Sequence, residues 1–405
     1  MPKLFILTFF FITAFTTLSF AQNQSLRTSG DLTFFSKSFL GLQNNFRSSN
    51  KSATKLNLSK SFNSTSAQLT LNFGEQDKFN LDNSFLQYSK GIATFGIGAV
   101  DRHWSFSKKT SLILSHNSRP IKSIYFKLKN KFSSDWLPSN SKWSLEFFNG
   151  FTEGSLNSKK SMLLGARAIL SPTPNLKFEF VQTSQWGGAE YDTGLSAFGA
   201  ALATDTNDES NSNINKMAGF GISYAIPLNK VQLQFYGQAI GEDEAGSLPS
   251  CYAYLVGSEL SYSGIKYPTT IGIEAVDTRV KKTAHGYCGA NTMYNNGIYN
   301  YTNYGKIMGA AISTEGTSLE LFGQTNLSEN VSLQYSTKIV VINDKDWSNH
   351  NLSSNRQTGS INSFSISWNK GDFNLTGNIY YQGVTLDKTH IKDGTGIGLS
   401  TSIKF

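Results

Sequence analysis

The chain has few cysteines, few prolines and few charged residues for its length. Its 405 residues include two cysteines, eight prolines and 16% charged side chains, whereas aromatic residues make up 13%. Two cysteines are too few for a four-cysteine metal framework. Beyond the first two dozen residues the sequence also lacks a run of about 20 apolar residues, the length of a membrane-spanning helix. The composition excludes a polytopic helical membrane protein and leaves a soluble protein or one that crosses a bilayer as strands.

The N-terminal segment has the pattern of a secretory signal peptide. Lys3 provides the positive charge, residues 4–15 provide the apolar core, and Ala21 ends a small-x-small cleavage site. We therefore expect a signal peptide at residues 1–21 and a mature chain that begins at Gln22. An N-terminal membrane anchor is the alternative, but the apolar core is short for a span.

The two cysteines, Cys251 and Cys288, both fall in segments predicted as loops. In a chain exported from the reducing cytoplasm they can form a disulfide. Their spacing does not show whether their Cα atoms come close enough, so a disulfide and two free thiols both stay open at this point.

After residue 28 the sequence alternates apolar and polar residues in blocks of about ten. Phe364, Ile366 and Trp368, for example, alternate with Ser365 and Ser367. Strands that cross a bilayer take about nine to eleven residues, whereas strands of soluble proteins average about five or six. The predicted strands are 29–36, 52–61, 65–73, 82–89, 92–99, 121–130, 141–150, 161–170, 176–183, 217–226, 230–239, 252–262, 267–276, 317–325, 331–341, 359–368, 373–381 and 394–405.

The connections between these strands are alternately short and long. Residues 369–372 form a short connection, for example, and residues 343–356 a long one. A further candidate strand at 304–313 breaks the alternation, so we assign it to one large loop over 277–317. The pattern predicts an all-β fold over residues 22–405: a closed antiparallel transmembrane β-barrel of about 18 strands, with short periplasmic turns and long extracellular loops.

The last predicted strand supports this fold. It places Ile397, Leu399, Ile403 and Phe405 on one face, and a terminal Phe after such a strand resembles the signal that bacterial barrels present to their assembly machinery. A strand of a soluble sandwich that happens to end in Phe is the alternative. We expect the outer membrane of a Gram-negative bacterium as the location, with its lipid and the barrel assembly machinery as partners.

Four segments resemble the Wzi family of capsule assembly proteins. In chain order they are Arg102-His103-Trp104 with residues 111–120, residues 164–167 with Ser171-Pro172 and 182–188, residues 241–246 with Pro249-Ser250, and residues 294–299 with 301–305. They follow the order of the family along most of the mature chain. The resemblance implies an 18-stranded outer-membrane barrel that holds capsular polysaccharide at the cell surface.

The sequence also departs from the family pattern. Gln182, Asn296 and Lys306 stand where the family often has Arg, His and Arg. The periplasmic helical bundle of the enteric members has no obvious counterpart, because residues from Asp31 onward already form a predicted strand. These departures leave room for a different polysaccharide or a different mode of attachment.

In a barrel, we expect specificity to come from the external loops and the lumen-facing side chains. Aromatic rings stack on the C–H faces of sugars, amides and carboxylates bind hydroxyl groups, and guanidinium groups bind acidic sugars bidentately. The candidates for polysaccharide binding are Arg102, His103, Trp104, Asn117, Arg119, Arg167, Gln185, Trp186, Glu242, Asp243, Glu244, Tyr294 and Tyr301. The net charge of +8 is compatible with an anionic polymer, although basic residues at a barrel rim also meet lipid phosphates.

The predicted function is that of a non-enzymatic, lectin-like protein that binds or retains capsular or extracellular polysaccharide during capsule assembly. We predict no catalytic residues, metal ligands or cofactors, since neither H-E-x-x-H nor G-x-S-x-G occurs. We also expect no binding of nucleic acid by an exported barrel. A general diffusion porin for small polar solutes is the alternative, because its signal peptide, strands and polar lumen would look the same. An outer-membrane hydrolase is a third class.

Overall fold

The computed structural model describes residues 26–38, 40, 52–74, 79–132, 138, 140–154, 160–188, 191–203, 214–245, 248–263, 266–282, 288–295, 299–389 and 391–405. The predicted signal peptide lies outside these residues. The elements of the described part are β1 (Arg27–Phe35), β2 (Ser52–Phe62), β3 (Thr65–Gly74), β4 (Phe85–Lys90), β5 (Ala93–Ala99), β6 (Lys122–Lys131), β7 (Lys142–Phe151), β8 (Met162–Ser171), β9 (Leu176–Trp186), α2 (Leu195–Ala203), β10 (Asn215–Leu228), β11 (Val231–Ala245), β12 (Leu248–Tyr262), β13 (Thr269–Asp277), β14 (Thr302–Asn303), β15 (Lys306–Ile307), β16 (Thr317–Asn326), β17 (Val331–Ile342), β18 (Gln357–Lys370), β19 (Phe373–Gln382) and β20 (Gly394–Lys404).

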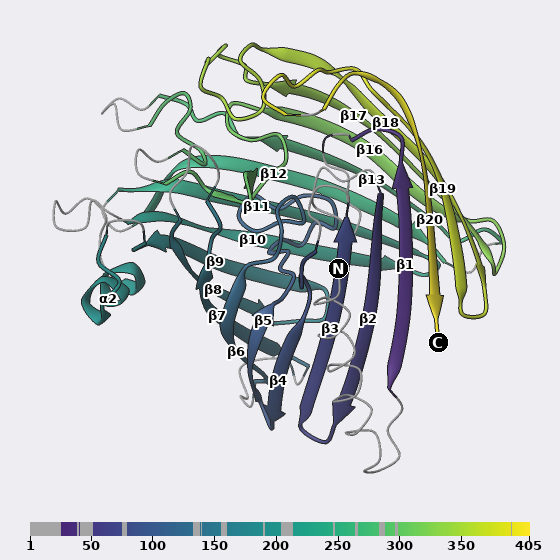
Figure 1. The fold of residues 1–405 in the computed structure, drawn as a ribbon, viewed down its shortest axis with the longest axis horizontal. Helices are drawn as coiled ribbons and strands as arrows, with labels where there is room; N and C mark the ends of the chain where they lie inside the picture. The colour runs from purple at the N-terminus through teal and green to yellow at the C-terminus, as the bar shows by residue number, and fades with distance from the viewer. Residues whose placement is uncertain are drawn as a thin grey trace, which may run out of the picture.

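Within these residues, 18 strands form one antiparallel sheet that closes into a barrel (Figure 1). The first strand pairs with the last, from Ser29 opposite Lys404 to Phe35 opposite Gly398. Closure leaves no free strand edge, which matters because hydrocarbon offers no partner for an unpaired N–H. The predicted closed antiparallel transmembrane β-barrel of 18 strands is confirmed.

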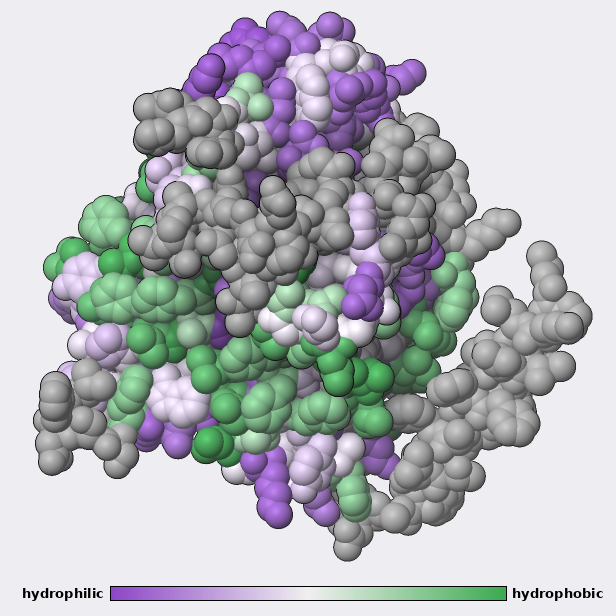
Figure 2. Space-filling view, turned by 90° about the vertical axis from the view of Figure 1, so that its left-hand side faces the viewer, coloured by the Kyte–Doolittle hydropathy of each residue, from purple (hydrophilic) through white to green (hydrophobic). Residues whose placement is uncertain are grey.

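Side chains alternate between the outer face and the lumen along each strand. Phe364, Ile366 and Trp368 are 40–47% exposed on the outside. Ser365 and Ser367 point into the lumen, where they form hydrogen bonds with residues of β19. Figure 2 shows apolar residues gathered across the strand wall and hydrophilic residues gathered above them. The outer face therefore has the apolar band of a membrane barrel.

The two ends of the barrel differ in their connections. At one end, here called the turn end, two-residue turns begin with Asn63, Gly91, Asn229 and Gly371, which have φ between 46° and 57°. Asn and Gly tolerate this left-handed conformation, which tight hairpins require. The chain ends at the turn end too, where the Phe405 N–H donates to the Thr28 carbonyl at 2.9 Å. The long connections at the opposite loop end include residues 100–121, 187–214, 278–316 and 343–356.

The sequence prediction and the structure differ at β11 and β12. Cys251 was expected in a loop, but it lies in β12. These two strands continue past the predicted limits at residues 239 and 252, and their pairing reaches Ala245 opposite Leu248. The apolar alternation does not extend over the polar run from Glu242 to Glu244, so the pattern could not reveal the paired backbone there. The loop predicted over 277–317 is confirmed, and the small ribbon β14–β15 lies inside it.

Helix α2, in the connection between β9 and β10, packs against the outside of the barrel wall. Trp186 alternates with the lumen-facing Gln185, so it belongs to the outer face, yet it is only 2% exposed. Phe198 of α2 packs edge-to-face on Trp186 at 5.6 Å, and Ala201 of α2 is buried. Helix α2 has nine residues, and none of the helices in the described ranges is long and apolar enough to cross a membrane.

Candidate functional site

The connection between β5 and β6, residues 100–121, folds into the lumen, and we call it the inner segment. Ser107 Oγ donates to Glu274 of β13, and the Leu112 N–H donates to Gln238 Oε1 of β11 at 2.9 Å. At the other end of the inner segment, Arg119 donates to Asp82, which lies just before β4. Strand β4 is halfway around the barrel from β13. The inner segment therefore crosses the lumen and is bonded to opposite walls.

Ion pairs fix the inner segment to carboxylates of the lumen wall. A buried carboxylate is costly unless a cation and hydrogen bonds compensate for the lost water. The pairs are Arg102–Glu146 at 2.9 Å, Lys108–Glu259 at 2.9 Å, Lys109–Glu320 at 3.5 Å and, within the wall itself, Arg167–Glu179 at 2.7 Å. The first three pairs hold the inner segment against the lumen wall.

The connection between β13 and β16, residues 278–316, lies over the inner segment, and we call it the covering loop. A disulfide joins its Cys288 to Cys251 of β12, with a Cα–Cα distance of 5.3 Å. This resolves the choice between a disulfide and free thiols. Asn117 of the inner segment donates from Nδ2 to the Ile307 carbonyl of the covering loop at 2.8 Å. The two connections are thus held to each other and to the wall.

Two buried tyrosines extend this attachment. The Tyr294 hydroxyl donates to the Leu112 carbonyl at 2.7 Å and accepts from the Ala310 N–H at 3.0 Å. The Tyr301 hydroxyl bonds Thr183 of β9 at 2.8 Å, and the two rings stack with centroids 6.0 Å apart. Burial raises the pKa of Tyr294, so its hydroxyl stays neutral and able to donate.

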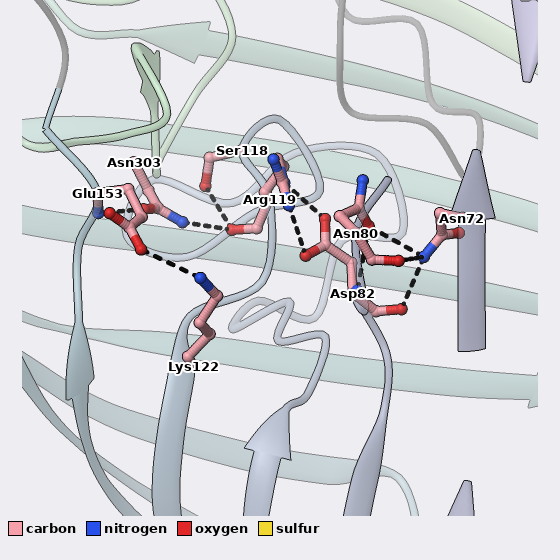
Figure 3. A network of polar contacts seen from close by, with 8 residues as sticks. All are labelled: Asn72, Asn80, Asp82, Ser118, Arg119, Lys122, Glu153 and Asn303. Atoms are coloured by element: carbon pink, nitrogen blue, oxygen red, sulfur yellow. Dashed lines mark hydrogen bonds and ion pairs between the residues drawn. The ribbon is translucent and has the colours of Figure 1, made fainter. Parts of the chain in front are cut away.

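A polar network at the loop end ties the covering loop to strands on the opposite wall (Figure 3). Arg119 binds Asp82 bidentately at 2.7 and 3.1 Å, and its guanidinium lies 3.7 Å from the Tyr304 ring centroid. Asn303 donates to the Arg119 carbonyl at 2.9 Å and accepts from the Glu153 N–H at 2.8 Å. The network holds β14 in position above the ends of β6 and β7.

A polar cavity of about 680 Å³ opens among three loops at the loop end, and we call it the external cavity. The covering loop contributes backbone and side chains that include Asn295 and Asn300. The β17–β18 loop contributes Trp347, Asn349, His350 and Asn351, and the β19–β20 loop contributes Lys388. Amides, an indole ring and an ammonium group are groups that bind hydroxyl-rich ligands. No cluster of three His, Cys, Asp or Glu residues that could hold a metal ion is found in the described ranges.

Two buried side chains shape the β17–β18 loop, residues 343–356. Asn343 Nδ2 donates to the carbonyls of Trp347 and Ser353 at 3.0 Å each, and its Oδ1 accepts from the Trp347 N–H. His350 Nδ1 accepts from the N–H groups of Leu352 and Ser353, while Nε2 lies 3.1 Å from the Thr314 carbonyl. The loop is therefore preorganised around its cavity-lining residues.

The structure separates the candidates chosen from the sequence into several places. Arg102, His103, Trp104, Asn117 and Arg119 belong to the inner segment, Arg167 faces the lumen, and Gln185 is buried against Asn300 of the covering loop. Trp186 lies under α2 on the outer face. Glu242 Oε2 accepts from the Tyr294 N–H at 3.0 Å, and Asp243 and Glu244 pair with Ser250 and Pro249 in the β11–β12 ladder. Tyr294 lines the external cavity, whereas Tyr301 is buried beside it.

Trp347, Asn349, Asn351 and Lys388 line the external cavity but were not among the sequence candidates. The run from Asn343 to Arg356 contains one tryptophan among several amides and charges. A lone aromatic in such a polar external loop is a usable signal for a sugar site. The family-like segments instead contain mainly residues that build the barrel interior.

Comparison with known sequences finds two similarities. The family model described as "Capsule assembly protein Wzi" matches residues 21–394. A Klebsiella pneumoniae protein, an uncharacterized 55.8 kDa protein in the cps region, is 25% identical over 206 residues, which cover 50% of this chain and 41% of that protein. The chain thus spans less than half the length of that relative.

Solved structures show the same fold. Wzi of Escherichia coli, described as an outer-membrane protein involved in group 1 capsule assembly and a carbohydrate-binding β-barrel, superimposes with a TM-score of 0.78 at 19% identity, covering 93% of this chain and 84% of that chain. OprD of Pseudomonas aeruginosa superimposes with a TM-score of 0.52 at 11% identity, covering 95% of each chain. Because the family model spans nearly the whole sequence, this chain belongs to the Wzi family of capsule assembly proteins.

Proposed function

We propose that this protein is a non-enzymatic, lectin-like barrel that retains capsular or extracellular polysaccharide at the cell surface and binds it in the external cavity. The observation that carries the proposal is the composition of that cavity. Amide groups of Asn349 and Asn351 can donate to and accept from sugar hydroxyls, while the Trp347 ring offers an apolar face to sugar C–H groups. Lys388 adds a cation for an acidic group.

The inner segment supports this function over the alternative, a general diffusion porin. A porin needs a water-filled lumen that is wide enough for solutes. Here the Leu112, Ile113 and Leu114 side chains lie in the lumen and are at most 4% exposed. Their packing with the covering loop favours a barrel that binds at its surface rather than one that conducts.

The polysaccharide-binding role of the sequence candidates also belongs to this proposal. Tyr294 borders the cavity, but it is only 2% exposed and its hydroxyl bonds Leu112 and Ala310, so it contributes by holding the covering loop in place. Arg102, Arg119 and Trp104 contribute indirectly, because they hold the inner segment on which the covering loop rests. The proposal further places the protein in the outer membrane of a Gram-negative bacterium after export by the signal peptide 1–21, with membrane lipid and the barrel assembly machinery as partners.

The test is a binding measurement with purified protein in detergent and extracellular polysaccharide purified from the host strain. We expect Trp347→Ala, and separately Asn349→Ala with Asn351→Ala, to weaken binding by about tenfold each, which corresponds to about 1.4 kcal/mol. Loss of one stacking ring or of two amide contacts accounts for a change of this size. Heat-modifiable electrophoretic mobility checks that each variant remains a folded barrel.

A matched control removes two amides far from the cavity. Asn326→Ala with Asn369→Ala changes exposed residues at the turn end and is expected to leave binding unchanged. Wild-type affinity in both cavity variants, or an equal loss in the control, would contradict the proposed site.

A further inference from the structure

Five lysines gather on the lumen-facing wall near the turn end: Lys127, Lys129, Lys131, Lys142 and Lys177. In β6 the lumen-facing residues are Tyr125 and every second residue after it, because Ile124 and Phe126 are exposed to the outside. In β7 Lys142 stands directly opposite Lys131, so both side chains project from the same face. In β9 Lys177 lies two residues from the buried, lumen-facing Glu179.

The arrangement concentrates like charges. Lys131 and Lys142 are direct cross-strand neighbours, a placement that is unfavourable for two cations. Lys127 has a carboxylate partner, since its Nζ lies 3.6 Å from Glu146. That carboxylate is shared with Arg102, whose Nε donates to it at 2.9 Å. Among the described residues of β6 to β9, the lumen-facing wall therefore carries more positive charge than its carboxylates neutralise.

The lysines also border a hollow. A cavity of about 360 Å³ is lined by Lys129, Lys131 and Lys142 together with Ser144, Ile169 and Ser171 of the same wall, and with Asn130 and Trp143. Farther along the same wall, Lys127 shares Glu146 with Arg102 of the inner segment. A concave surface that is lined by one sign of charge and backed by low-dielectric walls concentrates counterions. We call this hollow the basic basin.

The position of the basic basin points to its occupant. Short turns and chain ends mark the periplasmic side of single-chain outer-membrane barrels, so the basin faces the periplasm. Its lysines project into the lumen rather than toward lipid, which argues against phospholipid headgroups. Lysine is a flexible point charge that suits a polymer with regularly spaced anions better than one rigid ligand.

We propose that the basic basin binds a segment of carboxylate-bearing polysaccharide on the periplasmic side, at a site separate from the external cavity. This inference rests on the proposed function, because it takes the ligand to be a polysaccharide. It adds that the polysaccharide is acidic and that the protein has a second binding site for it. Lys129, Lys131, Lys142 and Lys177 supply the attraction, and Ser144 and Ser171 lie between them to bond hydroxyl groups.

The probe is fluorescently labelled polygalacturonate, a uronic acid polymer, with neutral dextran of equal length as its reference. Binding to the full-length barrel in detergent is measured by anisotropy at about 50 mM and about 200 mM salt, since counterions screen such contacts. We expect K129Q/K131Q/K142Q/K177Q to weaken polygalacturonate binding at least tenfold at low salt and to flatten the salt dependence. Dextran binding is expected to be unchanged.

The control variant K60Q/K90Q/K230Q/K370Q removes the same number of charges at the same end of the barrel. Lys90 follows the outward-facing Leu86 and Tyr88, and Lys370 follows Phe364, Ile366 and Trp368 at every second position, so these side chains point away from the lumen. We expect this variant to keep at least half of the wild-type affinity for polygalacturonate. Wild-type affinity in the basin variant, or an equal loss in the control, overturns the proposal.

The external-cavity variant Trp347→Ala separates this inference from the proposed function. If the basic basin acts alone on the acidic probe, Trp347→Ala keeps the salt-dependent part of polygalacturonate binding. Failure of the host polysaccharide to bind the external cavity would then refute the proposed function and leave the basin intact. Loss of the salt-dependent part in Trp347→Ala would instead assign the acidic ligand to the external cavity and refute the basin.

Discussion

At the scale of single residues, the cations of this protein lie in two different environments. Arg102 and Arg119 are buried with carboxylates and aromatic rings, where their planar guanidinium groups satisfy several partners at once. Lys129, Lys131 and Lys142 are exposed in a hollow. In the composition, all of these side chains simply count toward the net charge of +8. Only the burial of each side chain separates the cations that hold the barrel from those able to meet a ligand.

We expect His350 to make the external cavity sensitive to acid. Burial lowers the pKa of His350 below its ordinary value of 6.5. Its Nδ1 accepts from two backbone N–H groups, so a proton on that nitrogen removes both bonds. Because the pKa is lower in the folded loop than in the unfolded chain, the stabilisation is fully present above about pH 6.5 and declines as the pH falls toward the folded value.

We therefore expect hydrogen-exchange protection of the Leu352 and Ser353 amides to fall between pH 7 and pH 5, after correction for intrinsic exchange. His350→Asn is expected to show low protection of both amides at either pH, because Asn cannot span the same three partners. His116→Gln, a change outside this loop, serves as the control and is expected to follow the wild-type profile. Full protection of the two amides at pH 5 in the wild type would contradict this role.

At the scale of elements, the strands were predictable because lipid imposes a simple rule on them. Residues facing hydrocarbon must be apolar, so Phe364, Ile366 and Trp368 mark their strand in the sequence. The rule ends where the membrane ends. Strand β11 extends over Glu242 to Glu244 because its backbone pairs with β12 there. These residues show no alternation of apolar and polar side chains from which a strand could be predicted.

The candidate site was less predictable than the strands for a related reason. Trp104 and Tyr301 have the side chains of sugar-binding residues, but the fold buries both inside the barrel. Whether an aromatic ring binds a ligand or fills a core depends on which loops meet. That information is long-range, as with Asn117 and Ile307, which bond across nearly two hundred residues. Trp347 reaches the cavity only because three distant loops converge there.

The disulfide between β12 and the covering loop gives a prediction at this scale. Cys251 and Cys288 are 37 residues apart, and in the chain-entropy model such a link contributes up to about 4 kcal/mol. Most of the chain enclosed by this link belongs to β13 and the covering loop. We expect Cys251→Ser with Cys288→Ser to leave the barrel folded and to free the covering loop.

Limited proteolysis measures this effect. The double variant is expected to be cut within residues 278–316 at least ten times faster than the wild type, while its heat-modifiable mobility is retained. The control is Ser250→Ala, which alters the neighbouring residue and keeps the disulfide. Equal cleavage rates in the double variant and the wild type would show that Tyr294, Tyr301 and Asn117 hold the loop without the disulfide.

At the scale of the whole molecule, the barrel wall and the inner segment inside it contribute differently to the expected permeability. The same number of strands that encloses the inner segment would, when empty, surround a channel. The ion pairs of Lys108 and Lys109 with Glu259 and Glu320 close the lumen from one side, and the Arg119–Asp82 pair secures the other. We therefore expect conductance to depend on the inner segment rather than on the wall.

Planar-bilayer recording tests this dependence. We expect the wild-type protein to show no large steady openings, and a variant in which residues 103–117 are replaced by a short Gly-Ser linker to conduct. A linker inserted into the turn after Asn369 adds comparable chain length at the turn end and is expected to leave the barrel silent. Large steady openings in the wild type would instead favour a diffusion porin.

The attachment of the covering loop also determines how the molecule carries a mechanical load. A polymer held in the external cavity, as we propose, would pull on all three loops that line it, including the covering loop at residues 278–316. That pull passes through the disulfide to β12, through Asn303 and Glu153 to β7, and through Tyr301 to β9. Three separate strands share the force, and each belongs to a closed ring of hydrogen bonds. Tension on the covering loop would therefore be divided among β7, β9 and β12, so no single strand would bear it all.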